Sequence, residues 1–230
     1  MVKTILNHFF ELFFPRLCVC CGERLVNSEK FICLNCLYKL PKTNHLANPD
    51  NKLEVFFAGR FPFVRIASFA YFVKGGSIQK IIHEIKYKNN SRLAIYIGEI
   101  CGKEIAKSNY FDDVDFIVPI PLHRNRLKSR GYNQAMMLAN GISSKINIPV
   151  NAENLIRIID NPSQTKNSRF ERWKNTEGIF GIKDKNQFKD KHILLIDDVV
   201  TTGSTLEACA KLIVSCPEAR ISIFTVGFAV

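Results

Sequence analysis

Two acidic residues beside a hydroxyl-rich loop form the strongest candidate for chemistry in this chain of 230 residues. The acids, Asp197 and Asp198, follow an apolar run at 193–196 that predicts a buried parallel strand. The loop that comes next consists of Thr201, Thr202, Gly203, Ser204 and Thr205. Open α/β sheets bind ligands at the carboxyl ends of their strands, so the position of these residues favours a binding site.

The loop has the composition of a phosphate cradle. Backbone N–H groups, hydroxyls and the amino-terminal end of the following helix all attract a phosphate, and Gly203 permits close approach of the backbone. Carboxylates beside such a cradle can accept hydrogen bonds from the hydroxyls of a ribose. We therefore predict that a ribose 5-phosphate binds here, with Asp197 and Asp198 on the ribose and the loop at 201–205 on the phosphate.

A basic run lies between a second predicted strand and the helix that follows it. The segment 116–122 ends in a Pro-rich turn, and after it come Arg124, Arg126 and Arg130. A cationic loop in such a setting can clamp pyrophosphate or a nucleic-acid backbone. A solvated face is the ordinary alternative for a basic run. We predict that the three arginines bind pyrophosphate or nucleic acid.

Two C-x-x-C knuckles near the amino terminus have the spacing of a metal site. Their cysteines are Cys18, Cys21, Cys33 and Cys36. In a reducing compartment this spacing favours tetrahedral Zn²⁺ over disulfides, and four filled ligand positions predict a closed, structural site. Cys20 lies inside the first knuckle and is most simply a bystander. A redox pair, or a site that has lost its metal, is the alternative interpretation.

The composition is that of a folded protein with anionic partners. The hydrophobic fraction of 47% is sufficient for a packed core. The 32 Lys and Arg residues exceed the 21 Asp and Glu residues, and the resulting net charge of +11 favours nucleic acid, an anionic membrane surface or phosphorylated small molecules without choosing among them.

The first residues predict an amphipathic helix that Pro15 ends. Its apolar stripe, which includes Phe9 and Phe13, suits either docking into the protein's own core or contact with the inner face of a membrane. There is no secretory signal, and no apolar run approaches the ~18 residues that span a bilayer. We therefore expect a cytoplasmic protein.

Strands and helices alternate from residue 61 onward. Strands are predicted at 64–73, 115–119, 155–159, 192–196 and 221–228, and helices at 77–87, 93–106, 133–146 and 204–214. This alternation predicts an α/β fold with a mainly parallel sheet flanked by helices. The polar stretch at 41–52 is typical of a linker. We predict an amino-terminal part at 1–60, with the amphipathic helix, the zinc-binding module and the linker, and an α/β domain at 61–230.

Several of these motifs resemble those of known families. The segment HILLIDDVVTTGST at 192–205 is similar to the signature with which type I phosphoribosyltransferases bind phosphoribosyl pyrophosphate (PRPP). The cysteine knuckles, IIHEIKY at 81–87, VPIPLH at 118–123, RGYNQA at 130–135 and the pair Gln164-Thr165 resemble the ComF family, also called GntX, in the same order along the chain.

The resemblance implies a type I phosphoribosyltransferase-like domain with a small amino-terminal zinc-knuckle module. It also implies PRPP binding with Mg²⁺, with Asp197 and Asp198 as catalytic residues if transfer takes place, and a role in natural transformation. That role is the uptake or handling of single-stranded DNA, with competence or DNA-processing proteins as further partners. Whether the protein transfers a phosphoribosyl group stays open.

Two further readings stay open beside this one. The protein could be a small-molecule phosphoribosyltransferase that forms a nucleotide from PRPP and a base or amine, with no DNA role. For single-strand binding, the aromatic residues Tyr132, Phe170 and Trp173 are candidates, because basic residues interleave with the last two. Packing in the core is the alternative role for Trp173.

Overall fold

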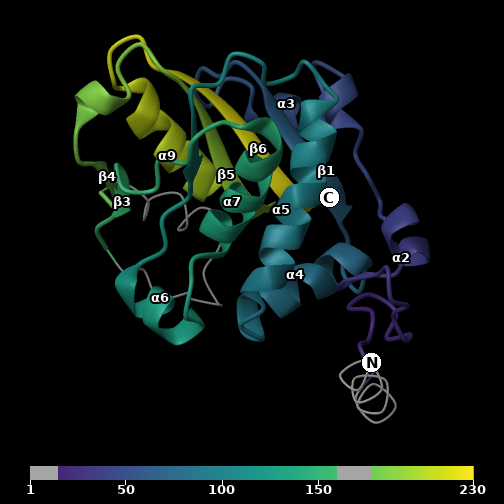
Figure 1. Cartoon of the computed structure of the whole chain (residues 1–230). Coiled ribbons are helices and arrows are strands. Elements are labelled where there is room, and N and C mark those ends of the chain that lie inside the picture. The colour runs from purple at the N-terminus through teal and green to yellow at the C-terminus, as the bar shows by residue number, and fades with distance from the viewer. Residues whose placement is uncertain (1–14, 160–177, 230) are drawn as a thin grey trace.

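The computed structural model describes residues 15–159 and 178–229, and a four-stranded parallel sheet forms its centre (Figure 1). In spatial order the strands are β1 (Ile66–Phe72), β6 (Arg220–Ala229), β5 (His192–Val200) and β2 (Phe116–Pro119). Helices cover both faces of the sheet, so the central strands β5 and β6 are buried along most of their length and carry apolar residues on both faces.

The helices of the described residues are α2 (Leu34–Tyr38), α3 (Lys52–Phe57), α4 (Ser77–Tyr87), α5 (Ser91–Ala106), α6 (Arg124–Arg130), α7 (Gln134–Ile146) and α9 (Ser204–Val214), with 3-10 turns η1 (His45–Ala47) and η2 (Lys185–Gln187). The four helices predicted at 77–87, 93–106, 133–146 and 204–214 are present, as α4, α5, α7 and α9, and α2, α3 and α6 are helices that were not predicted. Between 15 and 159 and between 178 and 229, no helix is both long enough and apolar enough to cross a membrane.

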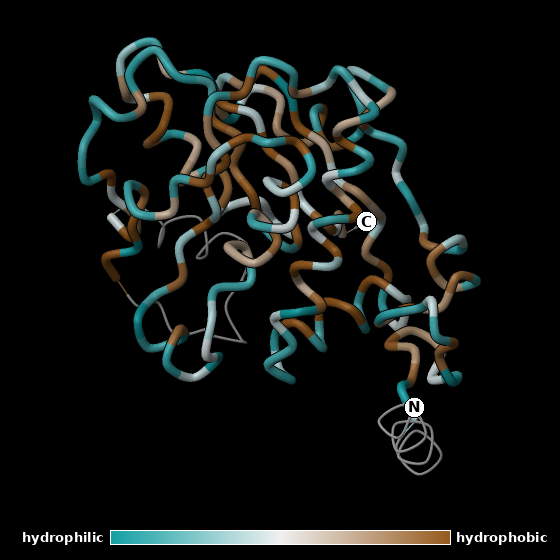
Figure 2. Tube along the Cα trace, viewed as in Figure 1, coloured by the Kyte–Doolittle hydropathy of each residue, from teal (hydrophilic) through white to brown (hydrophobic). Residues whose placement is uncertain are grey.

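Side chains of the sheet divide between two hydrophobic cores. On β5, Leu194 and Ile196 pack in one core with α4, α5, α7 and the cysteine-rich module at 18–40. Ile193 and Leu195 pack in the other core with α3 and α9. Successive residues of a strand point to opposite faces, so one apolar strand serves both cores. Figure 2 shows the hydrophobic residues gathered in the strands and the hydrophilic ones along the outer loops.

The third predicted strand does not join the main sheet. Instead, β3 (Leu155–Arg157) pairs antiparallel with β4 (Phe180–Ile182) in a separate two-stranded sheet. The sequence predicted a strand here without a partner for it, because apolar periodicity identifies a strand but not what the strand pairs with. Asn154 links the two strands, since its side chain accepts from the N–H of Asp184 and donates to the carbonyl of Asp184, both at 2.9 Å.

The stretch predicted as a linker is packed against β1. Lys42 forms a bridge to Ala70, and the N–H of Thr43 donates to the carbonyl of Phe69 at 3.1 Å. The side chain of Asn51 then caps α3, which buries Leu53, among others, in the core. The division of the chain near residue 60 stays a prediction.

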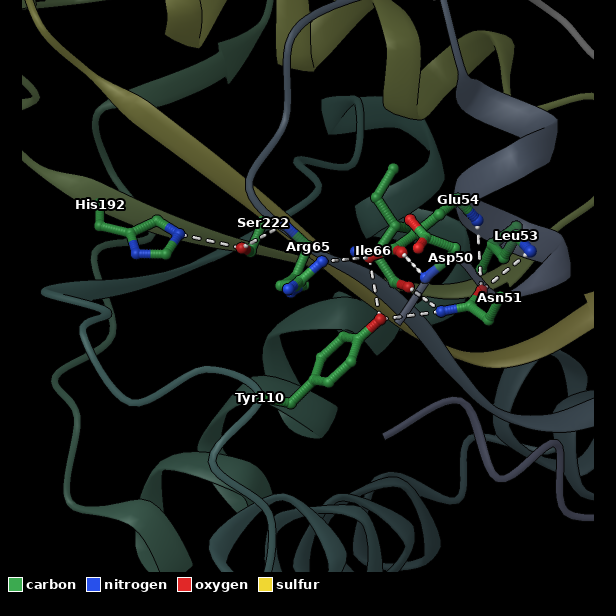
Figure 3. Close-up of polar contacts among 9 residues, drawn as sticks. All are labelled: Asp50, Asn51, Leu53, Glu54, Arg65, Ile66, Tyr110, His192 and Ser222. Atoms are coloured by element: carbon green, nitrogen blue, oxygen red, sulfur yellow. Dashed lines mark hydrogen bonds and ion pairs between the residues drawn. The ribbon is translucent and has the colours of Figure 1, made fainter. Parts of the chain in front are cut away.

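A polar network holds the amino-terminal ends of the strands (Figure 3). The buried carboxylate of Glu54 accepts from the Tyr110 hydroxyl at 2.8 Å and from the N–H of Ile66 at 3.0 Å, which ties α3 to the start of β1. His192 at the start of β5 lies 2.9 Å, Nε2 to Oγ, from Ser222 on β6. This end of the sheet is therefore occupied by structural contacts, and the candidate ligand groups lie at the other end.

The predicted amphipathic helix near the amino terminus lies outside the described residues. The same holds for the segment that contains Gln164, Phe170 and Trp173.

Candidate functional site

The acidic pair lies on the last part of β5. The strand continues to Val200, beyond the predicted end at residue 196, so Asp197 and Asp198 are strand residues that point to opposite faces. Asp198 is buried and its Oδ1 lies 2.9 Å from Nζ of Lys86, a residue of α4. The N–H of Asp198 donates to Oδ1 of Asp197 at 2.8 Å. One carboxylate thus carries a cation partner and the other a backbone donor.

The two carboxyl groups differ in their electrostatic surroundings. Burial raises the pKa of Asp197 to about 7, and the negative charge of Asp198 contributes to the rise, while Lys86 opposes it. A cation or a hydrogen-bond donor that approaches such an Asp stabilises its ionised form, so the interaction is favourable. The pair is therefore suited to a ligand that brings hydroxyl donors or a cation.

The loop at 201–205 turns from β5 into α9 through Gly203. Gly203 has a φ of +73°, and a Cβ there would lie 2.6 Å from Cζ of Phe57, so both the backbone conformation and the space require glycine. The hydroxyls of Thr202 and Ser204 lie 3.1 Å apart. The predicted reason for glycine was close approach to a phosphate, and the structure adds packing against α3.

Arg60, which is not part of the loop, contacts both the loop and the helix α9 that follows it. Its guanidinium donates to the carbonyl oxygen of Thr202 at 3.1 Å and forms an ion pair with Glu207 at 2.6 Å, Nη2 to Oε2. The Glu207 carboxylate is buried in the first turn of α9 and pairs with Lys211 as well. The charge of Glu207 is thereby compensated within the protein, which limits its repulsion of an anion at the loop.

The basic run predicted as a loop is the helix α6. His123 caps its first turn by accepting from the N–H of Asn125, and Gly131 ends it in the left-handed conformation with a φ of +76°. Most of the residues between are good helix formers and both ends are capped, so the segment is helical and the prediction of a loop was wrong. The amino-terminal side chains of α6 still follow the carboxyl end of β2, as predicted.

A basic cleft of about 640 Å³ separates α6 from the end of α4. Its described lining residues include no acid and are Lys86, Tyr87, Asn89, Arg126, Lys128, Ser129, Arg130 and Gly131. Arg126 and Arg130 of the predicted set therefore face one cleft, whereas Arg124 is not part of the described lining. Lys86 belongs both to this lining and to the ion pair with Asp198, so it connects the cleft with the acidic pair.

The four predicted metal ligands come together. The Sγ atoms of Cys18, Cys21, Cys33 and Cys36 all lie within 4.8 Å of one another, and Cys21 and Cys33 are 3.8 Å apart. A tetrahedron of thiolates at a Zn–S distance of ~2.3 Å has an edge of ~3.8 Å, so the spacing of these four sulfur atoms is close to that of a zinc site. The structure confirms a cysteine cluster that can hold such a metal.

The surroundings of the four cysteines shift the pKa values of their thiols. Burial opposes ionisation of Cys18, but hydrogen bonds from the backbone N–H groups of Cys33, Cys21 and Cys20 outweigh it and lower the pKa of Cys18 to about 6. Burial and the neighbouring sulfur atoms raise the pKa of Cys36. Four thiolates this close repel one another unless a divalent cation neutralises them, and a bound metal supplies that charge.

Cys20 takes a different role from its neighbours. It is buried, and its carbonyl oxygen accepts a hydrogen bond from Lys80 of α4. Burial, and next the charge of Cys18, raises the pKa of Cys20 to about 11. Cys20 therefore packs the module against α4, the helix that also carries Lys86.

Sequence reasoning missed two residues and misjudged a third. Lys86 lies in the segment IIHEIKY, whose resemblance to the ComF family drew attention to it without giving it a role. Nothing in the local sequence of Arg60 marks it. Tyr132, a candidate for stacking on bases, is buried and its hydroxyl donates to the carbonyl of Ile85, so it supports the turn between α6 and α7 and does not face a ligand.

Comparison with known proteins gives consistent matches. The family model described as "Phosphoribosyl transferase domain" matches residues 132–227. Competence protein F of Haemophilus influenzae is 24% identical over 213 residues, which are 87% of this chain and 92% of that protein. Competence protein ComFC of Bacillus subtilis is 38% identical over 120 residues, or 51% of this chain and 47% of that protein.

Two further matches complete the comparison. DNA utilization protein YhgH of Escherichia coli is 26% identical over 150 residues, 64% of this chain and 65% of that protein. The solved structure of glutamine PRPP amidotransferase from B. subtilis has a TM-score of 0.43 and 11% identity over 63% of this chain and 30% of that one. The family model and the parallel sheet together identify a type I phosphoribosyltransferase fold.

Proposed function

We propose that this chain, which belongs to the ComF family, binds PRPP or a related phosphorylated ribose at Asp197–Thr205 and acts on single-stranded DNA during natural transformation. The observation that carries the proposal is the position of Lys86. Its ammonium group contacts Asp198 at 2.9 Å, and Lys86 also lines the basic cleft, so groups suited to ribose and groups suited to phosphate form one continuous site.

The parts of the site suit the parts of PRPP. The carboxylates of Asp197 and Asp198 accept hydrogen bonds from the ribose hydroxyls, and the loop at 201–205 receives the 5′-phosphate. Arg126 and Arg130 neutralise the pyrophosphate in the cleft. Mg²⁺ that entered with PRPP would be held beside Asp197 and Asp198 and would offset the charge of the pyrophosphate; the raised pKa of Asp197 suits a site that a cation enters.

Transfer of the phosphoribosyl group is the narrower form of this proposal. The acids would then steady the ribose as positive charge develops at its reacting carbon, and the cleft would neutralise the departing pyrophosphate. An amine or a nucleobase nitrogen would be the acceptor. A PRPP turnover screen with free bases tests this form separately from binding.

The DNA role rests on charge and on the relatives. The names of three relatives refer to competence or to DNA utilization. The net charge of +11 and a cleft lined by four cationic side chains are what a nucleic-acid backbone requires. We further propose that the four-cysteine cluster holds structural Zn²⁺, which keeps the module folded against α4.

A salt titration of single-strand binding tests the DNA role. Affinity for a fluorescent oligonucleotide is measured at several salt concentrations for the wild type and for the double variant Arg126→Glu, Arg130→Glu. Each lost phosphate contact lowers the slope of log affinity against log salt by about 0.7. A matched control carries Lys183→Glu and Lys189→Glu, the same charge change on exposed residues near the opposite end of β5.

The expected result is a flatter slope and weaker binding for the arginine variant only, with reduced transformation in a strain that carries it. Absence of single-strand binding near physiological salt, together with normal transformation in that strain, would refute the DNA role. The function would then be that of a small-molecule phosphoribosyltransferase.

A further inference from the structure

Resting on the proposed binding of single strands, we infer that Tyr87 is a stacking platform for a nucleobase whose neighbouring phosphates lie in the basic cleft. The residue is the last of α4 and 68% of its surface is exposed. It lines the cleft together with the cationic side chains of α6. An exposed aromatic face beside a cationic groove is the arrangement with which proteins bind single strands without reading their sequence.

The helical spacing of α4 explains why Tyr87 faces outward. The buried side of this helix consists of isoleucines, namely Ile78, Ile81, Ile82 and Ile85. At 100° per residue, Tyr87 lies about 200° round the helix from Ile85, on the side away from the core. His83, one turn earlier, stands beside it with ring centroids 4.9 Å apart and limits the directions the tyrosine ring can take.

Arg130 fixes the relation between the ring and the charges. Its guanidinium lies 5.8 Å from the centroid of the Tyr87 ring and donates to Oε1 of Gln134 at 3.1 Å. An arginine held in this way presents positive charge next to the aromatic face. A phosphate that pairs with the cleft cations therefore leaves the attached base within reach of Tyr87.

The exposure of the Tyr87 ring selects the ligand. In a duplex the faces of the bases are hidden in the stack, and a protein reaches them only after paying for unstacking. In a single strand the faces are available, so an open ring beside four cations fits a flexible strand with several phosphates. Duplex DNA would use the cations of the cleft and gain nothing from Tyr87.

Tyr38 provides a matched control for this site. It ends α2 in the cysteine-rich module, is 90% exposed and does not line the cleft. The two tyrosines thus share residue type, position at a helix end and exposure, and differ in their distance from the cations.

The test measures fluorescence anisotropy with two labelled probes at several salt concentrations. One probe is oligo-dT and the other is an abasic oligonucleotide with the same number of phosphates. The proteins are full-length wild type, Tyr87→Ala, Tyr87→Phe and Tyr38→Ala. We expect Tyr87→Ala to bind oligo-dT about fivefold or more weakly, with an unchanged salt slope and unchanged affinity for the abasic probe. Tyr87→Phe and Tyr38→Ala should resemble the wild type.

Each other outcome is decisive. Equal binding of oligo-dT by Tyr87→Ala and wild type would overturn the platform and leave the DNA role intact. A matching loss for the abasic probe would mean that Tyr87 supports the phosphate contacts, which also overturns the platform. If dTMP competed as strongly as oligo-dT, the ligand would be a mononucleotide and not a strand. Absence of salt-sensitive binding to either probe would refute the DNA role and the platform together.

Discussion

Replacing Asp197 by asparagine should stabilise the protein while it weakens ligand binding. The pKa of Asp197 is raised from 3.8 to about 7 by burial and by the charge of Asp198. Below pH 7 the folded state therefore keeps a proton that the unfolded state has released above pH 3.8. Stability falls by about 1.4 kcal/mol per pH unit between these two values and stays level above pH 7.

The size of the effect follows from that window. A difference of three pKa units corresponds to about 4 kcal/mol, and because Asp197 keeps part of its surface exposed we expect about half of this, ~2 kcal/mol, at pH 8. Asparagine keeps the shape and the hydrogen-bond acceptor but not the charge. The gain from Asp197→Asn should be small at pH 4.5 and grow towards pH 8.

Urea unfolding at both pH values measures this difference. Asp198→Asn is the control, since Asp198 pairs with Lys86 at 2.9 Å and its loss should give no comparable gain. The reasoning would be refuted if Asp197→Asn destabilised the protein, or if its gain in stability were the same at pH 4.5 and pH 8. Either result would mean that the ionised form of Asp197 does not destabilise the folded state.

Three further outcomes follow from the structure. Cys21→Ser should lower the zinc content of purified protein well below one equivalent, whereas Cys20→Ser should leave it unchanged; metal analysis decides, and the reverse pattern would overturn the ligand set. Gly203→Ala should cost about 2–4 kcal/mol of unfolding free energy, against about 1 kcal/mol for Gly75→Ala, which has a similar φ and nothing within 4 Å of its added Cβ; equal costs would exclude the packing contact. Burial lowers the pKa of His45 to about 4, so stability should fall as the pH drops from 6.5 to 4, and His45→Phe should flatten this dependence in urea unfolding; an unchanged dependence would contradict a neutral buried imidazole.

The sequence was most informative where one pattern determines one structure. The apolar run before Asp197, the helical period of residues 77–87 and the spacing of the cysteine knuckles each depend on near neighbours, and the structure has a strand, a helix and a four-cysteine cluster there. Such patterns can be interpreted from the sequence alone, because the burial of one face and the spacing of metal ligands are set by residues close together in the chain.

Long-range contacts decided the features that the sequence did not reveal. The pairing of β3 with β4 depends on residues that are distant in the chain, and Lys86 of α4 meets Asp198 of β5 only because the fold brings these distant segments together. For Tyr132, the neighbouring sequence suggested a role that a long-range contact overrules. Its place among basic residues suggested a surface role, yet the turn after α6 directs its hydroxyl to the backbone of α4.

The most direct test of the central claim is a calorimetric comparison of PRPP and inorganic phosphate as ligands. The proteins are the wild type and the double variant Asp197→Asn, Asp198→Asn. If the acids contact the ribose and the loop contacts the 5′-phosphate, the double variant should lose at least about tenfold in PRPP affinity, because charged acceptors are replaced by neutral ones, while its phosphate affinity stays within about twofold. Equal losses for the two ligands, or unchanged PRPP binding in the double variant, would contradict the assignment of the ribose to the acidic pair.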